Sequence, residues 1–199
     1  MPPRAYAQSA RASAVDARRE EVLASAIMLF MERPYDDLAL HTIAERSGVS
    51  LKTIMRQFGS KEELFLAAMH WSAARETARR AAPAGDLPTI VATLADRYEE
   101  IADSVMRRVA VEDRVPAVRQ AADNARRSHL AWLGEAFAAS LPAEPDPRRA
   151  TRLAALFTAT ELYSWWSVRH LGFTREQALA AMLETLEALV QHWRSRSVP

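Results

Sequence analysis

Residues Thr42–Lys61 read TIAERSGVSLKTIMRQFGSK, and this stretch decides the fold of the region around it. Gly48 is the residue best able to adopt the positive φ of a tight turn, and Ser50, shortly after it, is a favoured N-cap. Ile54 and Phe58 are four residues apart and form the inward stripe of a short helix. The pattern predicts two short helices joined by a tight turn, which is the helix-turn-helix arrangement.

The outward face of the second helix is suited to nucleic acid. It combines a cation with hydroxyl, amide and small apolar groups, and its side chains are Leu51, Lys52, Thr53, Met55, Arg56 and Gln57. Such a mixture is typical of helices that read bases in the major groove. Four cations against the single acid Glu45 give Thr42–Lys61 a net charge of +3. That charge favours a phosphate-bearing partner over the alternative, a solvated pair of helices.

Val22–Met69 resembles the N-terminal domain of the tetracycline-repressor (TetR) family of transcription regulators. The resemblance rests on IAERSGVS, on the following TIMRQF and on SKEEL. It implies a helical homodimer with an N-terminal DNA-binding domain of three helices and a larger, sequence-variable domain that senses a small ligand. It also implies that Ser50–Phe58 is the reading helix, with phosphate contacts from Met55, Gln57 and Lys61.

The chain departs from the usual pattern of that family at several positions. Pro34 stands where Gly usually closes the first helix, so this helix must end by Arg33 in another way. His41, Met55 and Gln57 stand where Arg, Tyr and His are common in the family. Since Met55 cannot donate a hydrogen bond, these changes bear on individual contacts and on the operator sequence rather than on the domain.

We therefore expect the DNA contacts to divide into base readout and phosphate binding. Lys52 should read bases, and Leu51 and Thr53 offer contacts to thymine methyl groups. Phosphates should be held by the neighbouring cations and amide and by the N-terminal end of the helix. The candidate DNA-binding residues are His41, Thr42, Ser50, Leu51, Lys52, Thr53, Met55, Arg56, Gln57 and Lys61.

Composition predicts an all-α protein with about nine helices. The 199 residues include only five Gly, and their net charge of +1 means that the nucleic-acid signal is local. The absence of Cys excludes disulfides and thiolate metal sites. No apolar run is long enough to span a membrane and no signal peptide is visible, so we expect a cytoplasmic protein without a membrane partner.

Catalysis is the competing class of function, and the sequence offers little for it. The histidines show no HxxxH or HExxH spacing, and no GxSxG motif or Gly-rich phosphate loop is found. We expect no catalytic residues, no metal and no cofactor.

The chain divides into four predicted segments. These are a disordered basic arm over 1–15, the helix-turn-helix domain over 16–60, a connecting helix over 61–80, and a ligand-binding and dimerisation domain over 81–199. The last segment should hold four long helices, over about 87–108, 116–141, 147–171 and 175–193.

Large side chains at helical spacing in the last segment are candidates to line a ligand pocket, although they also suit an ordinary core. Glu161 lies four residues from both Phe157 and Trp165, which places a carboxylate among aromatic rings. Such a carboxylate needs either an Arg of the protein or a cationic ligand. The candidates are Tyr98, Met106, Trp132, Phe137, Phe157, Glu161 and Trp165.

The final helix has more than one apolar stripe, and a surface helix needs only one. Antiparallel packing of the last helical hairpin against its copy would bury the second stripe and form a dimer with two-fold symmetry. The alternative is that one subunit buries both stripes. The candidate interface residues are Leu179, Met182, Leu183, Leu186, Leu189, Val190 and Trp193.

These features predict a homodimeric DNA-binding regulator, most simply a repressor. Its partners would be a palindromic operator with half-sites about one helical turn apart, a second copy of the chain and a small hydrophobic or aromatic effector. The alternative is a DNA-organising or division-control protein on the same scaffold, with many sites and no effector.

Overall fold

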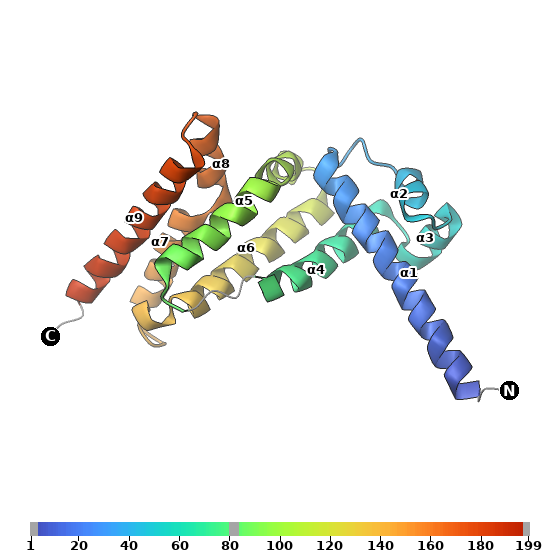
Figure 1. Cartoon of the computed structure of the whole chain (residues 1–199), viewed down its shortest axis with the longest axis horizontal. Coiled ribbons are helices and arrows are strands. Elements are labelled where there is room, and N and C mark those ends of the chain that lie inside the picture. The colour runs from blue at the N-terminus through green and yellow to red at the C-terminus, as the bar shows by residue number, and fades with distance from the viewer. Residues whose placement is uncertain (1–3, 80–83, 197–199) are drawn as a thin grey trace. The chain divides into compact units, whose positions relative to one another are not determined.

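The computed structural model describes residues 4–79 and 84–196, and within these ranges it is predominantly helical without any strand (Figure 1). The elements are α1 (Arg4–Glu32), α2 (Leu40–Ser47), α3 (Leu51–Phe58), α4 (Lys61–Arg79), α5 (Leu87–Val109), α6 (Pro116–Ala136), the 3-10 helix η1 (Ala138–Ser140), α7 (Arg148–Thr160), α8 (Leu162–His170) and α9 (Arg175–Ser195). The predicted all-α fold is confirmed.

Two compact units make up the chain, and each has its own core. Unit 1 consists of Met1–Glu76 and Arg107–Ala122, and unit 2 of Thr77–Met106 and Asp123–Pro199. The sequence placed residues 107–122 in the second domain. In the structure they belong to unit 1 because the apolar side chains around the start of α6 are buried in its core; these are Val115, Ala117 and Val118.

Helices α1 to α4 form most of unit 1. α1 contributes a buried stripe that includes Val22, Ala26 and Phe30, and its spacing of four residues is that of one helix face. The Phe30 ring meets the Phe65 ring of α4 edge to face, with their centroids 4.8 Å apart. α1 ends at Glu32, just before Pro34, as the proline requires.

The beginning of α1 differs from the sequence prediction. Helix is described from Arg4 onward, whereas the sequence predicted a disordered arm through residue 15. That stretch is rich in Ala and Arg, which are strong helix formers, and it contains no proline after Pro3. The lack of an apolar period argued for disorder, but it does not prevent a helix from extending outward from a buried segment.

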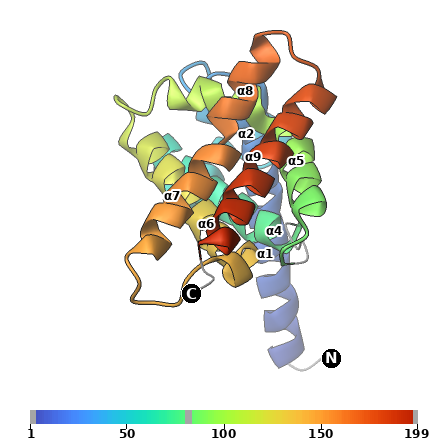
Figure 2. The same ribbon diagram turned by 90° about the vertical axis from the view of Figure 1, so that its left-hand side faces the viewer.

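In unit 2, α7 and α9 lie side by side, and α8 contacts both of them (Figure 2). One fully buried side chain from each of several helices forms the centre of the core: Leu94, Leu133, Leu156 and Leu186. α9 begins with a capping box, in which the Gln177 amide N–H donates to Thr174 Oγ1 and the Thr174 amide N–H donates to Gln177 Oε1.

The prediction of one helix over 147–171 is wrong, because the chain breaks at Glu161. This residue has φ −72° and ψ 135°, and its carboxylate accepts a hydrogen bond from the Ser164 amide N–H at the start of α8. The Thr160 carbonyl, which leaves the helix at the break, accepts a hydrogen bond of 2.5 Å from the Tyr98 hydroxyl. Glu161 therefore caps α8 and does not share a helical stripe with Phe157 and Trp165.

Candidate nucleic-acid interface

The turn between α2 and α3 has the predicted geometry. Gly48 ends α2 in the left-handed region with φ 68°, where a residue with a Cβ atom is strained. Ser50 caps α3, since its Oγ accepts a hydrogen bond of 3.2 Å from the Thr53 amide N–H. Ile54 and Phe58 are buried, so the opposite side of α3 faces outward.

The end of α3 is also set by local signals. Gly59 has φ 76° and donates its amide N–H to the Met55 carbonyl. Ser60 and Glu63 then form a capping box at the start of α4, through hydrogen bonds of 3.1 and 3.2 Å. Because both ends of α3 are determined, the direction in which its side chains project is determined as well.

On α3 the structure brings the predicted reading residues together on one exposed face. Two apolar side chains are unusually open to solvent, Leu51 at 43% and Met55 at 47%. Lys52 and Arg56 are exposed beside them, and neither has a side-chain partner among the described residues. Of the remaining candidates, Ser50 and His41 are exposed and the others partly buried; these are Thr42, Thr53, Gln57 and Lys61.

Two cations that contributed to the predicted net charge are engaged elsewhere. Arg46 forms a bidentate ion pair with Glu32 at 2.6 and 2.9 Å, and the Arg46 guanidinium lowers the pKa of the Glu32 carboxyl. The Lys61 ammonium lies 4.1 Å from the centroid of the Tyr35 ring, and burial lowers the pKa of this Lys. The predicted net charge of +3 therefore overestimates the number of cations available to bind phosphate. Of the four cations in Thr42–Lys61, Lys52 and Arg56 lie on the exposed face of α3.

Within unit 1, the end of α5 holds the end of α1. Arg107 donates from Nη2 to the Met31 carbonyl, and Arg108 donates from Nη1 to the Phe30 carbonyl at 3.4 Å. These carbonyls belong to the last turn of α1, which lacks intrahelical donors. The sequence analysis missed both arginines; their only signal was a pair of cations at a helix end, where they also complement the helix dipole.

Comparison with known proteins agrees with this geometry. Residues 22–68 match the model of a family described as "Bacterial regulatory proteins, tetR family". Residues 22–68 therefore carry the N-terminal domain that is typical of the TetR family. The fold of this chain is similar to that of a tetR-family transcriptional regulator from Streptomyces coelicolor, with a TM-score of 0.67 and 17% identity over 90% of this chain and 89% of the other. A TetR transcriptional regulator from Rhodococcus sp. RHA1 has a TM-score of 0.59 and 18% identity over 87% and 96% of the two chains.

The residues that the sequence predicted to line a ligand pocket do not form one group, although Tyr98 and Trp165 both line a groove between α5 and α8. Tyr98, Phe137 and Trp165 are buried in the core of unit 2, and the others are partly buried. The rings of Phe157 and Trp132 both lie near the His129 ring, with centroid distances of 5.6 and 5.8 Å. The stripe of Phe157, Glu161 and Trp165 does not exist, because the break at Glu161 rotates α8 relative to α7.

The candidate dimer residues of α9 divide into two groups. One group is buried in the core of unit 2 of the same chain: Met182, Leu186, Val190 and Trp193. These residues match the alternative in which one subunit buries the stripe by itself. The other three are partly buried at the edge of that core: Leu179, Leu183 and Leu189.

Within the part of the chain that the structure describes, no three His, Asp or Glu side chains are grouped as a metal site would need. The same residues include no helix with the length and apolarity needed to cross a bilayer.

Proposed function

We propose that this protein is a ligand-responsive repressor of the TetR family that binds a palindromic operator as a homodimer and is released by a small aromatic effector. The fold is that of DNA-binding transcriptional regulators. In this proposal unit 1 binds DNA, and unit 2 binds the effector and the second subunit.

The exposed face of α3 is the observation that carries the proposal. Leu51 and Met55 are four residues apart and expose their apolar side chains, which is unfavourable in water but suits contact with thymine methyl groups in a major groove. Lys52 and Arg56 lie on the same helix and have no described partner. Cations without a described partner, beside exposed apolar groups, suit a surface that binds the phosphates and base edges of DNA.

The two cations are proposed to differ in role. Lys52 lies near the start of α3, the part of a recognition helix that usually contacts base edges, so we assign it to readout. Arg56 lies in the last turn of α3, and with Gln57 it is assigned to phosphates. Lys61 has a smaller part than the sequence suggested, because the Tyr35 ring already covers its ammonium group.

The contact of α5 with α1 supports an effector-dependent release. Arg107 and Arg108 hold the last-turn carbonyls of α1, and the same helix α5 begins at Leu87 within unit 2. A ligand that favours one position of α5 would therefore bias α1 and the helices packed on it. Such a ligand shifts a population between DNA-competent and released states.

Dimerisation is proposed through the outward faces of α8 and α9. The inward stripe of α9 is already buried in its own unit. Large apolar side chains nevertheless remain exposed on α8 and in the connection to α9; these are Tyr163, Leu171 and Phe173. Exposed apolar groups gathered in one segment often mark an interaction site, and a two-fold axis would place two α3 helices in successive major grooves.

Selection of genomic DNA fragments by the purified protein tests the proposal. One or two palindromic sites should be bound by two chains and far more tightly than random duplex. Lys52→Ala should weaken the selected site about ten- to a hundredfold while changing random duplex much less. Arg56→Ala should weaken both duplexes and lower the salt slope by about one unit. The measurements are binding titrations at two or more salt concentrations.

Arg127→Ala is the matched control, because it removes the same charge from an exposed Arg of α6, which pairs only locally with Asn124. It should leave both affinities within about twofold. If Lys52→Ala lost as much affinity for random duplex as for the selected site, and so behaved like Arg56→Ala, the assigned roles would be contradicted. Many dispersed sites of similar affinity would instead favour the DNA-organising alternative.

A further inference from the structure

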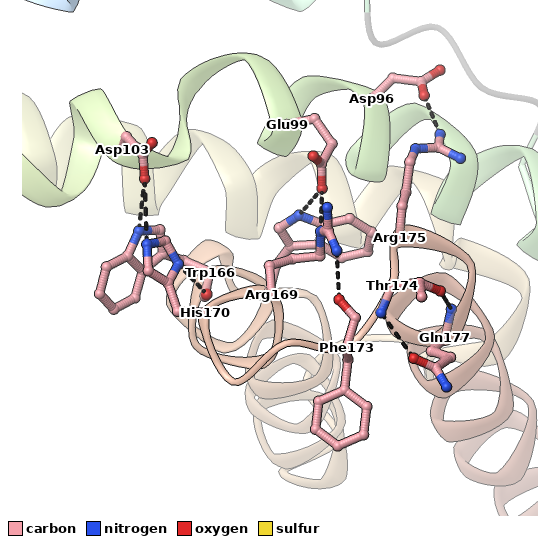
Figure 3. Close-up of polar contacts among 11 residues, drawn as sticks. Asp96, Glu99, Asp103, Trp166, Arg169, His170, Phe173, Thr174, Arg175 and Gln177 are labelled. Atoms are coloured by element: carbon pink, nitrogen blue, oxygen red, sulfur yellow. Dashed lines mark hydrogen bonds and ion pairs between the residues drawn. The ribbon is translucent and has the colours of Figure 1, made fainter.

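An open groove of about 250 Å³ lies between α5 and α8 in unit 2. Figure 3 shows acidic side chains of α5 pointing toward aromatic and basic side chains of α8. The groove is lined by Tyr98, Glu99, Ala102, Asp103, Trp165, Trp166, Arg169 and His170. It was not found from the sequence, because the two carboxylates lie more than sixty residues from the indole rings that they bind.

Two carboxylates on one face of α5 are held in place by these indole rings. Glu99 Oε1 accepts hydrogen bonds from Trp165 Nε1 at 3.0 Å and from Arg169 Nε at 2.9 Å. Asp103 Oδ1 accepts one from Trp166 Nε1 at 2.9 Å. The second oxygen of each carboxylate, Glu99 Oε2 and Asp103 Oδ2, has no partner among the described residues. Each carboxylate is therefore fixed by one oxygen and retains an acceptor at the other.

Aromatic side chains form the rest of the groove. Tyr98 and Trp165 are almost completely buried, with ring centroids 6.3 Å apart, and provide a rigid floor. The Trp166 ring is partly buried, and its centroid lies 3.9 Å from that of the exposed His170 ring. Rings of this kind attract cations and stack on planar groups.

The charges that face the groove favour a cation. Glu99 and Asp103 on α5 oppose the single guanidinium of Arg169 on α8, so with His170 neutral the lining has a net charge of −1. Arg175 of α9 does not offset this charge, because it pairs with Asp96 and neither lines the groove. A cationic donor forms a stronger, charge-assisted hydrogen bond to the free carboxylate oxygens than a neutral donor does, and an anion would be repelled by them.

We propose that this groove binds a planar aromatic cation, such as an aryl amidine, and that this class of molecule is the effector. The aromatic part stacks among the indole rings, and the cationic N–H groups donate to the free oxygens of Glu99 and Asp103. The effector role rests on the repressor function proposed above. The effector would act on unit 1 through α5, which carries both carboxylates. Near the C-terminal end of this helix, Arg107 and Arg108 donate hydrogen bonds to carbonyls of α1.

Calorimetric titration with benzamidine tests the site directly, with benzamide as a neutral ligand of nearly the same shape. Wild-type protein should bind benzamidine with a Kd of roughly millimolar or tighter, and benzamide at least about tenfold more weakly. Asp103→Asn removes the charge but keeps the acceptor for Trp166, and it should weaken benzamidine about tenfold or more. Asp96→Asn is the matched control on the same helix, outside the groove, and should stay within about twofold.

The same ligands are then added to the complex with selected operator DNA. Benzamidine should lower the affinity of wild-type and Asp96→Asn protein for DNA, but not that of Asp103→Asn. Equal binding of benzamide, or unchanged binding to Asp103→Asn, would overturn the site. Binding without any change in DNA affinity would overturn the effector role. Failure to select any DNA would refute the repressor function, whereas the calorimetry would still decide the groove.

Discussion

Two turns in this protein are built in opposite ways. Between α2 and α3, Gly48 takes φ 68° and Ser50 caps the next helix, so the residues of the turn stabilise it. Between α7 and α8, Glu161 turns the chain without Gly or Pro. There the freed Thr160 carbonyl is bound by the hydroxyl of Tyr98, which is 62 residues away in the sequence.

The difference explains which parts of a helical protein are visible in its sequence. A turn that depends on residues within three positions leaves a readable pattern of Gly and capping side chains. A turn that depends on a distant donor leaves none, because the donor can come from any element that packs nearby. Three substitutions test whether each turn depends on its own residues or on a distant donor.

The largest effect is expected from Tyr98→Phe, which removes the hydroxyl at the α7–α8 turn and keeps the ring. A buried carbonyl left without its donor costs about 1–3 kcal/mol, so the free energy of unfolding of unit 2 should fall by that amount. Hydrogen exchange of unit 2 amides measures it separately from unit 1. Tyr163→Phe is the control, since this side chain is 54% exposed, and it should change stability by less than about 0.5 kcal/mol. Equal costs would show that the turn does not need its distant partner.

Gly48→Ala should have an intermediate effect, at the turn that is stabilised locally. A Cβ atom at Gly48 would meet nothing within 4 Å, so the cost is that of the left-handed backbone alone, about 1–2 kcal/mol. Gly134→Ala is a control of opposite sign. Gly134 lies within α6, where Ala is the better helix former, and its added Cβ would lie 3.8 Å from an Arg149 nitrogen. It should stabilise by about 0.5–1 kcal/mol. Denaturant unfolding of each variant checks both values, and a neutral Gly48→Ala would contradict the conformational argument.

Glu161→Ala should have the smallest effect, although it lies at the turn that the sequence missed. Glu is not a favoured N-cap, and its hydrogen bond to the Ser164 amide N–H is 3.3 Å long. The loss in unfolding free energy should be under about 1 kcal/mol, below that of Ser50→Ala at the start of α3. Thermal unfolding of the two variants compares them directly. A larger loss for Glu161→Ala would mean that this turn is determined by its own cap after all.

Most of unit 1 was predictable from the sequence because its signals are short in range. The bounds of α3 agree within a residue with the expected Ser50–Phe58, and the caps at Ser50 and Ser60 are both formed. The exposed reading face follows from these bounds and the helical period. The pairing of Arg46 with Glu32 was not predictable, since the two residues are on different helices and either had other partners available.

In unit 2 the sequence indicated the helices but not which side chains of different helices come together. The large aromatic residues were recognised as notable, but Glu161 was given the wrong role because a continuous helix was assumed across the break. Of the residues that line the groove, the sequence singled out Tyr98 and Trp165 but missed Glu99 and Asp103. Each carboxylate lies on an amphipathic helix, where an acidic residue ordinarily faces solvent, and only the packing of α8 on α5 brings it against an indole ring.

By itself, the sequence determined the all-α fold, the helix-turn-helix and the face of α3 that is exposed. Those features depend on backbone conformation, caps and periodicity, which act over a few residues. Only the tertiary structure decided the break at Glu161, the attachment of α5 to α1 and the acidic, aromatic groove. These depend on which donors and acceptors meet when helices pack, and that pairing is decided by the whole core rather than by any one segment.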